Sequence, residues 1–187
     1  IRKNHAYCDP IEQHIQRIKQ DFTTGLKIKV VLDCGCGAGS VVTPRLLTEL
    51  GCEVISLNCY PTGFFPRHGE PTEPNLSDLA IATKELAADL GIAHDGDADR
   101  MMAVDDKGRF IPGDKLMGIL ARSLKAKRII TTVDASMTIE EMGFSVKRSR
   151  VGDSHVSTAL KKDGDFGGEP SGCWIFPSVS LCPDGIY

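Results

Sequence analysis

An acidic run in the middle of the chain has the residue types that bind a metal ion. Asp95, Asp97 and Asp99 alternate with the small residues Gly96 and Ala98. Small residues let the backbone curl until the three carboxylates face one point, where they would repel one another without a cation. Carboxylate oxygens are the donors that hard divalent ions prefer, and three of them with an open position suit Mg²⁺ shared with a phosphate. The pattern therefore predicts a Mg²⁺ site.

This acidic run has three other interpretations. A solvated acidic turn explains a lone Asp-x-Asp pair well, but a triple alternation beside Arg100 favours a metal. A calcium-binding EF-hand loop needs glycine at its sixth position, where Arg100 stands, and flanking helices, where strands are expected. Phosphotransferases of the haloacid dehalogenase type also begin with an aspartate pair after an apolar strand, the first aspartate being the nucleophile. That enzyme class stays open as an alternative.

A second candidate site follows near the end of the chain. Glu169 and Ser171 stand two residues apart with glycines on both sides. This suits the vicinal hydroxyls of a sugar, because the carboxylate accepts hydrogen bonds while the hydroxyl donates or accepts them. Taken alone, the segment is also an ordinary glycine-rich turn.

A glycine turn, residues 34–39, follows the apolar run 31–33 and resembles the first motif of S-adenosylmethionine-dependent methyltransferases. Such an enzyme usually has an acidic residue at the end of its second strand, where this chain has Asn58. The simpler interpretation is a tight turn that lets a helix and a strand pack closely. Cys34 and Cys36 could bind a soft metal, but no second cysteine pair completes a four-ligand site.

The bulk properties exclude several classes of partner. The 187 residues carry a net charge of −3, which gives no field to attract nucleic acid or an anionic membrane. No apolar stretch approaches the roughly 20 residues of a membrane-spanning helix, and no secretory signal is recognised. The odd number of cysteines favours reduced thiols, so we expect a cytoplasmic protein that binds a small molecule. These cysteines are Cys8, Cys34, Cys36, Cys52, Cys59, Cys173 and Cys182.

The elements that must position these residues alternate between helix and strand. The first part of the chain predicts helices at 9–22, 43–50 and 76–89, strands at 29–33, 52–57 and 92–94, and a surface loop at 61–75. A hairpin over 101–104 and 109–111 follows. The acidic run therefore leaves the carboxyl end of a strand, where open α/β sheets bind their ligands.

A second round of alternation begins at Pro112. It predicts helices at 114–124, 138–142 and 154–162 and strands at 128–133 and 145–148. The expected fold class is α/β, with two consecutive α/β domains whose mixed, mostly parallel sheets are flanked by helices. We expect the domains to span residues 1–104 and 105–187.

The run from Gly91 to Arg100 resembles the metal-binding loop of the α-D-phosphohexomutases, the family of phosphoglucomutase, phosphomannomutase and phosphoglucosamine mutase. The resemblance implies that Asp95, Asp97 and Asp99 hold Mg²⁺, which also contacts a phosphoserine, and that Arg100 helps to hold the phosphoryl group in transit. The implied reaction interconverts hexose 1-phosphate and 6-phosphate through a bisphosphate intermediate.

The segment Gly168–Gly172 resembles the sugar-binding loop of the same family, which implies that Glu169 and Ser171 recognise sugar hydroxyls. This chain departs from the family at two positions. Pro170 stands where methionine or glutamine is more common, and Cys173 stands where histidine is often found.

A third match is the segment Arg150–Asp153, which resembles a basic-x-Gly-Asp segment of phosphoglucosamine mutases. The resemblance implies that Arg150, Gly152 and Asp153 bind the substrate. The stretch 133–137 has no lysine for a general base, as in the phosphoglucosamine type.

The resemblance covers essentially the whole chain and corresponds to the second and third of four family domains, with residues 1–104 domain II-like and residues 105–187 domain III-like. The phosphoserine loop and the terminal phosphate-binding loop of the family are not recognised in it. We therefore expect the chain alone to be inactive, with a hexose phosphate and the missing domains of the same enzyme as its partners. The alternatives are a methyltransferase fragment and a non-catalytic sugar-phosphate binding module.

Overall fold

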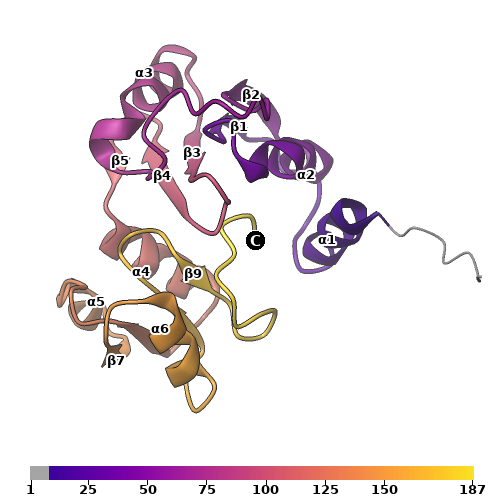
Figure 1. Ribbon diagram of the computed structural model, residues 1–187. Helices are drawn as coiled ribbons and strands as arrows, with labels where there is room; N and C mark the ends of the chain where they lie inside the picture. The colour runs from indigo at the N-terminus through magenta and orange to yellow at the C-terminus, as the bar shows by residue number, and fades with distance from the viewer. Residues whose placement is uncertain (1–8) are drawn as a thin grey trace, which may run out of the picture.

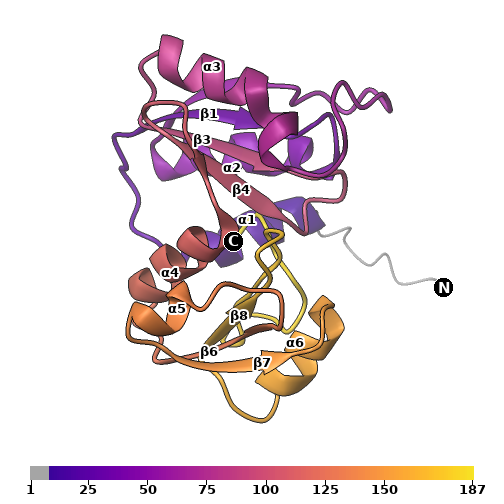
Figure 2. The same ribbon diagram turned by 90° about the vertical axis from the view of Figure 1, so that its left-hand side faces the viewer.

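The computed structural model describes residues 9–187. They form two α/β units, each built around its own sheet and flanked by helices (Figure 1). Figure 2 shows the two units stacked along the long axis of the molecule, with the C-terminal segment returning between them. The expected fold class is confirmed.

The first sheet has five strands in the order β2-β1-β3-β4-β5. Strand β1 lies parallel to β2 and β3, while β4 lies antiparallel to β3 and β5. Because β5 pairs with β4, this sheet continues beyond residue 104, where the domain boundary was expected. The strands are β1 (Lys29–Asp33), β2 (Glu53–Leu57), β3 (Leu90–His94), β4 (Met101–Asp105) and β5 (Phe110–Ile111).

The helices of the first unit follow the predicted order. Asp9 caps α1 by accepting a hydrogen bond from the backbone of Ile11, and the apolar face of α1 buries Ile15 and Ile18. The elements are α1 (Pro10–Lys19), η1 (Ala38–Val41), α2 (Thr43–Leu50), η2 (Glu73–Leu76) and α3 (Ser77–Glu85).

The predicted end of α3 at residue 89 was wrong, because the helix stops at Glu85. Ala87 adopts a left-handed conformation with φ of 48°, and the N–H of Ala88 donates to the carbonyl of Thr83. This closure is usually made by glycine, which has no Cβ to resist it. The sequence offered no such signal until Gly91, which lies inside β3.

The second sheet has four strands in the order β7-β6-β8-β9. Strand β6 lies parallel to β7 and β8, and β8 forms an antiparallel hairpin with β9. The β8–β9 hairpin was not predicted, since two of the three β8 residues are glycines, which are rare in strands. The elements are α4 (Gly113–Ser123), β6 (Arg128–Thr132), α5 (Thr138–Glu141), β7 (Ser145–Ser149), α6 (Asp153–Leu160), β8 (Phe166–Gly168) and β9 (Trp174–Ile175).

One hydrophobic core continues through both units. It includes Val31 and Met102 of the first sheet and Phe166 and Trp174 of the second. The C-terminal segment closes the junction, where the ring of Tyr187 lies 4.7 Å from that of Phe176 and 5.2 Å from that of Phe22, measured between centroids. The two units are therefore held in a fixed relation, which matters because the candidate site draws on both.

The expectations about membranes and cysteines can be compared with the described residues. Across residues 9–187 every helix is too short or too polar to cross a membrane. The six cysteines in this range form no disulfide with one another, and Cys8 lies outside it.

Candidate metal and substrate site

The acidic loop follows β3 directly, at the carboxyl end of that strand. Asp95, Asp97 and Asp99 each present a carboxylate oxygen, and these oxygens lie within 4.8 Å of one another. Ala98 makes the turn possible by adopting a left-handed conformation, with φ of 62°. Within residues 9–187 this is the single cluster of three or more acidic, histidine or cysteine side chains with such spacing.

The electrostatics of the loop favour a bound cation. Burial raises the pKa of Asp95 to about 7, and the neighbouring carboxylate of Asp99 contributes to the shift. Arg100 offsets only part of this repulsion, because its Nε lies 3.5 Å from Oδ2 of Asp95 and 3.9 Å from Oδ1 of Asp99. That Nε is buried without a hydrogen-bond partner among the described residues. The donor set fits Mg²⁺, which would neutralise the clustered charge.

His94 supports the loop from beneath. Its Nε2 lies 3.1 Å from the hydroxyl of Thr43 and its Nδ1 lies 3.1 Å from the carbonyl of Arg100. Burial lowers the pKa of His94, which favours a neutral ring with both nitrogens hydrogen-bonded. The side chain therefore connects α2 to the far end of the acidic loop.

The glycine turn packs directly against the acidic loop. The N–H of Ala38 donates to the carbonyl of Gly96 at 2.9 Å. A Cβ on Gly37 would lie 2.4 Å from the same carbonyl oxygen, so only glycine fits there. The close packing gives the turn a structural role and does not support the methyltransferase interpretation.

The predicted sugar loop forms the tight turn of the β8–β9 hairpin. Glu169 is buried, and its Oε1 accepts a hydrogen bond from the N–H of Gly152 at 2.7 Å. Ser171 is exposed at the tip. Pro170 packs against the start of α4, where a Cβ on Gly113 would lie 1.9 Å from the proline carbonyl oxygen. The structure thus holds the carboxylate firmly and leaves the hydroxyl open to solvent.

The two loops lie side by side although about 70 residues separate them in the sequence. Arg100 and Cys173 form an antiparallel bridge, and the N–H of Met101 donates to the carbonyl of Gly172 at 3.0 Å. The indole of Trp174 also donates to the carbonyl of Met101, at 2.8 Å. A metal held by the first loop would therefore lie next to a sugar held by the second.

Cys173 occupies the place where the family resemblance predicts histidine. Burial raises the pKa of its thiol to about 12, with a contribution from the charge of Asp99. A neutral buried thiol cannot replace an imidazolium as a phosphate ligand.

Arg150 and Asp153 lie on either side of the turn that leads into α6. Both side chains are exposed, and within residues 9–187 neither forms an ion pair or a hydrogen bond. Of this predicted segment, only Gly152 contacts another predicted site residue, through its N–H to Glu169.

Two residues of the 61–75 loop also reach the acidic loop, and the sequence pattern indicated neither of them. Arg67 donates to the carbonyl of His94, and Glu70 lies 3.3 Å from Nη1 of Arg100. The one sequence feature that could have indicated Arg67 is that it is a basic residue in a proline-rich loop.

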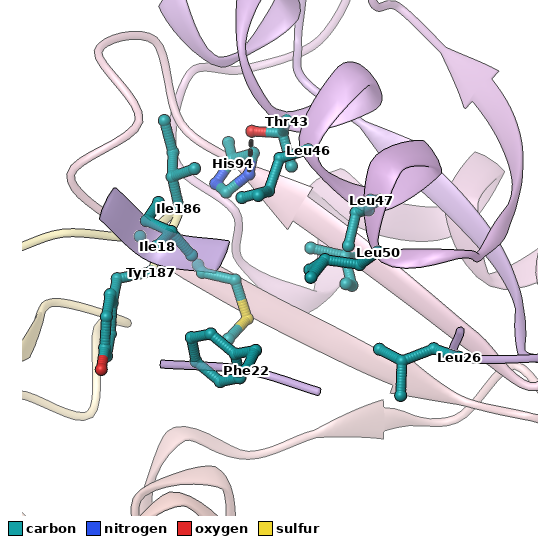
Figure 3. Close-up of a pocket in the computed structure, with 13 residues that line it drawn as sticks. Ile18, Phe22, Leu26, Thr43, Leu46, Leu47, Leu50, His94, Ile186 and Tyr187 are labelled. Atoms are coloured by element: carbon teal, nitrogen blue, oxygen red, sulfur yellow. Dashed lines mark hydrogen bonds between the residues drawn. The ribbon is translucent and has the colours of Figure 1, made fainter. Parts of the chain in front are cut away.

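A mostly apolar cavity is distinct from this charged site. It has a volume of about 210 Å³ and lies between α1, α2 and the C-terminal segment (Figure 3). Figure 3 shows Thr43 hydrogen-bonded to His94 among side chains such as Leu46, Phe22 and Ile186. A lining of this kind offers nothing to hold a phosphate.

Comparison with known protein families matches the chain in two consecutive segments. Residues 5–108 match the phosphoglucomutase/phosphomannomutase alpha/beta/alpha domain II, and residues 112–187 match domain III of the same family. The last strand of the first sheet, β5, lies between the two segments.

Similar proteins give the same assignment. A probable phosphoglucosamine mutase of Methanocella arvoryzae is 56% identical over 99% of this chain, and one of Methanococcoides burtonii is 51% identical over 96%. A phosphoglucomutase/phosphomannomutase family protein from Burkholderia thailandensis has a solved structure with a TM-score of 0.84 and 29% identity, covering 96% of this chain and 42% of that one.

The chain spans 43% of the length of each of the two relatives, so it corresponds to part of a larger multidomain enzyme. The two matched domains and the identity to these relatives indicate the same family. The chain belongs to the phosphoglucomutase/phosphomannomutase family, of which it contains domains II and III.

Proposed function

We propose that this chain supplies the metal-binding and sugar-binding parts of a Mg²⁺-dependent phosphoglucosamine mutase. The observation that carries the proposal is the bridge between Arg100 and Cys173, which joins the acidic loop to the turn that contains Glu169. A phosphoryl-transfer site needs both a cation for the moving group and groups that orient the sugar.

The residues of the chain have distinct roles in this proposal. Asp95, Asp97 and Asp99 would hold Mg²⁺, which when bound supplies positive charge to the transferred phosphoryl group. Arg100 adds a second positive charge beside it, in a part-buried position where electrostatic interactions are strong. Glu169 accepts from a sugar hydroxyl with its remaining lone pairs.

Two further residues contribute from the edges of the site. Ser171 is exposed and able to exchange hydrogen bonds with the sugar, and Arg150 is exposed two residues before Gly152, which donates to Glu169. Arg150 and the start of α6 at Asp153 would contact the anionic part of the substrate.

The substrate class follows from the relatives. Both of the similar proteins above bear the name phosphoglucosamine mutase, and their identity to this chain exceeds 50%. We therefore assign a hexosamine phosphate as the substrate, interconverted between its 1-phosphate and 6-phosphate through a bisphosphate. The phosphoserine that exchanges the phosphoryl group would come from another domain of the same cytoplasmic enzyme, so the chain alone would bind but not catalyse.

Calorimetry tests the metal half of this proposal. Mg²⁺ is titrated into the chain and into an Asp97→Asn variant, with S-adenosylmethionine as a parallel ligand. Binding of Mg²⁺ that the variant abolishes supports the proposal. Binding of S-adenosylmethionine without any response to metal would overturn it.

Nuclear magnetic resonance tests the sugar half. Glucosamine 6-phosphate and mannose 6-phosphate are each added to isotope-labelled protein in the presence of Mg²⁺. The proposal predicts shifts at the amides of Gly152 and Ser171 at lower concentrations of the glucosamine compound. Equal responses to both sugars would contradict the assignment of a hexosamine.

A further inference from the structure

Arg67 is a mostly buried arginine in a loop that is otherwise largely exposed. Its side chain is 11% exposed, and that of its partner Asp33 is 2% exposed. The Nε of Arg67 donates to Oδ2 of Asp33 at 2.9 Å. A buried ion pair of this kind is costly to form unless further hydrogen bonds satisfy both groups. The partners in those hydrogen bonds show which segments of the chain the Arg67–Asp33 pair holds in place.

The guanidinium of Arg67 connects three separate backbone segments. Beyond Asp33 at the end of β1, Nη2 donates to the carbonyl of His94 at the end of β3. Nη1 donates to the carbonyls of His68 and Gly69, at 3.1 and 3.3 Å. The fork of an arginine is suited to such multiple acceptors, whereas a lysine ammonium cannot reproduce it. His94 is the residue directly before the first aspartate of the acidic loop.

Asp33 extends the same network to the glycine turn. Its Oδ1 accepts from the N–H of Gly35 at 2.7 Å and from the amide of Asn58 at 3.3 Å. The glycine turn itself contacts the acidic loop, because the N–H of Ala38 donates to the carbonyl of Gly96. The Arg67–Asp33 pair therefore fixes the acidic loop directly before its first residue, through His94, and along its middle, through Gly96.

Glu70 lies three residues after Arg67 and faces the other end of the acidic loop. Its Oε1 lies 3.3 Å from Nη1 of Arg100. Glu70 is mostly exposed, so this contact does little for overall stability. It does, however, orient through Nη1 a guanidinium whose Nε has no hydrogen-bond partner among the described residues.

We propose that Arg67 and Glu70 are positioning residues for phosphoryl transfer, with Arg67 fixing the start of the metal-binding loop and Glu70 orienting the guanidinium of Arg100. The proposal rests on the proposed function, which makes the acidic loop a metal site. Residues that orient metal ligands commonly change metal affinity by about 10- to 100-fold when they are replaced.

Three variants separate positioning from a general contribution to folding. Arg67→Lys keeps the positive charge beside Asp33 but loses the fork. Glu70→Gln keeps the size of an exposed side chain but loses its charge. Arg109→Lys is the matched control, because Arg109 pairs with Asp105 in the hairpin between β4 and β5.

The first measurement is hydrogen exchange of single amides in the metal-free protein. The amide of Arg100 bonds to Asp95 at 3.2 Å and that of Ala38 bonds to Gly96, so both report on the acidic loop. Arg67→Lys should raise the exchange rates of the Arg100 and Ala38 amides by about tenfold through local opening. In the same variant the exchange rate of the Ile130 amide, in the second sheet, should stay unchanged. In Arg109→Lys the exchange rates of the Arg100 and Ala38 amides should also stay unchanged. Equal rates in Arg67→Lys and the control, or uniform acceleration that includes Ile130, would overturn the role of Arg67.

The second measurement is the side-chain Nε–Hε resonance of Arg100. Glu70→Gln should shift this resonance while the exchange of the Ala38 amide stays at the parent rate. An unchanged resonance would overturn the role of Glu70, and this test is valid even if Arg67→Lys fails to fold.

The third measurement is Mn²⁺ binding by calorimetry. Arg67→Lys should raise the dissociation constant by about tenfold, and Arg109→Lys should leave it unchanged. If the parent chain itself binds no Mn²⁺, the proposed function fails, while the amide and side-chain measurements still decide whether Arg67 and Glu70 position the loop.

Discussion

The acidic loop and the sugar loop meet at one bridge but are held in different ways. The acidic loop is anchored by the glycine turn, by His94 and by the buried Arg67. The sugar loop depends on its own hairpin and on the hydrogen bond from Gly152 to Glu169. Clustered carboxylates repel one another, so contacts from neighbouring segments must hold them together. A turn that recognises a sugar must instead leave space for the sugar. Rigidity is therefore concentrated on the metal side.

The largest expected effect is on metal binding by Asp95→Asn. This change removes the buried member of the acidic cluster, so the affinity for Mg²⁺ should fall by about 100-fold or more, above the range for residues that only orient ligands. Metal-free stability should not fall, because repulsion with Asp99 is also removed. Calorimetry and urea unfolding measure the two quantities.

Asp106→Asn, in the exposed turn after β4, is the control for that experiment. An Asp95→Asn protein with the parent's affinity for Mg²⁺ would show that the acidic loop is not the metal site.

The anchoring of the acidic loop can be weakened through the glycine turn. In Gly37→Ala the new methyl group would lie 2.4 Å from the carbonyl oxygen of Gly96, and neighbouring backbone would have to move. The free energy of unfolding should fall by about 1–3 kcal/mol, as for other overpacked sites. Gly69→Ala meets nothing within 4 Å and should unfold at the parent's urea concentration. Equal urea midpoints of unfolding for Gly37→Ala and Gly69→Ala would refute the close packing of Gly37 against Gly96.

Proton binding should compete with metal binding at the acidic loop. The pKa of Asp95 is raised from its ordinary value of 3.8 to about 7, mainly by burial. The affinity for Mg²⁺ should therefore fall by about tenfold for each pH unit below 7, because the ligand must lose its proton. Titrations from pH 8 down to about pH 6 measure this, and Asp95→Asn should remove the dependence.

The raised pKa of Asp95 has the opposite consequence for the stability of the metal-free protein, which should benefit from a lower pH. A folded-state pKa above the unfolded one means that the folded state binds the proton more tightly. The contribution of Asp95 to stability is therefore unfavourable above pH 7, and this penalty disappears as the pH falls from 7 towards 4. Metal-free protein whose stability decreased over that window in the parent but not in Asp95→Asn would contradict the assignment.

The smallest effects are expected at the sugar loop. Glu169→Ala leaves the N–H of Gly152 without its acceptor and should lower the free energy of unfolding by about 1 kcal/mol. Ser171→Ala should leave stability unchanged, since Ser171 is exposed. Both should weaken binding of glucosamine 6-phosphate in a resonance titration. Loss of stability in Ser171→Ala would mean that the turn is part of the folding core.

The parts that could be predicted from the sequence are those fixed by local pattern. The alternation of apolar strands and amphipathic helices indicated both sheets, and the spacing of Asp95, Asp97 and Asp99 indicated a cluster that the structure also forms. Glu169 and Gly152 were each assigned to substrate binding, although only through a family resemblance, and the structure joins the two by a hydrogen bond.

The parts that could not be predicted depend on contacts between distant segments. Gly167 and Gly168 enter a strand because β6 and β9 pair on either side of them. Arg67 is buried because the ends of β1 and β3 together offer acceptors that no local pattern reveals. Long-range pairing overrides the preference of single residues in both cases.

The central claim is that one site is built from both loops, and Mn²⁺ tests it most directly. Mn²⁺ broadens the resonances of nuclei close to it, so it is added to isotope-labelled protein while the amides of Ser171 and Gly172 are followed. The account predicts strong broadening at these two amides that Asp97→Asn abolishes. Broadening confined to other acidic surfaces, with the amides of Ser171 and Gly172 unaffected, would contradict it.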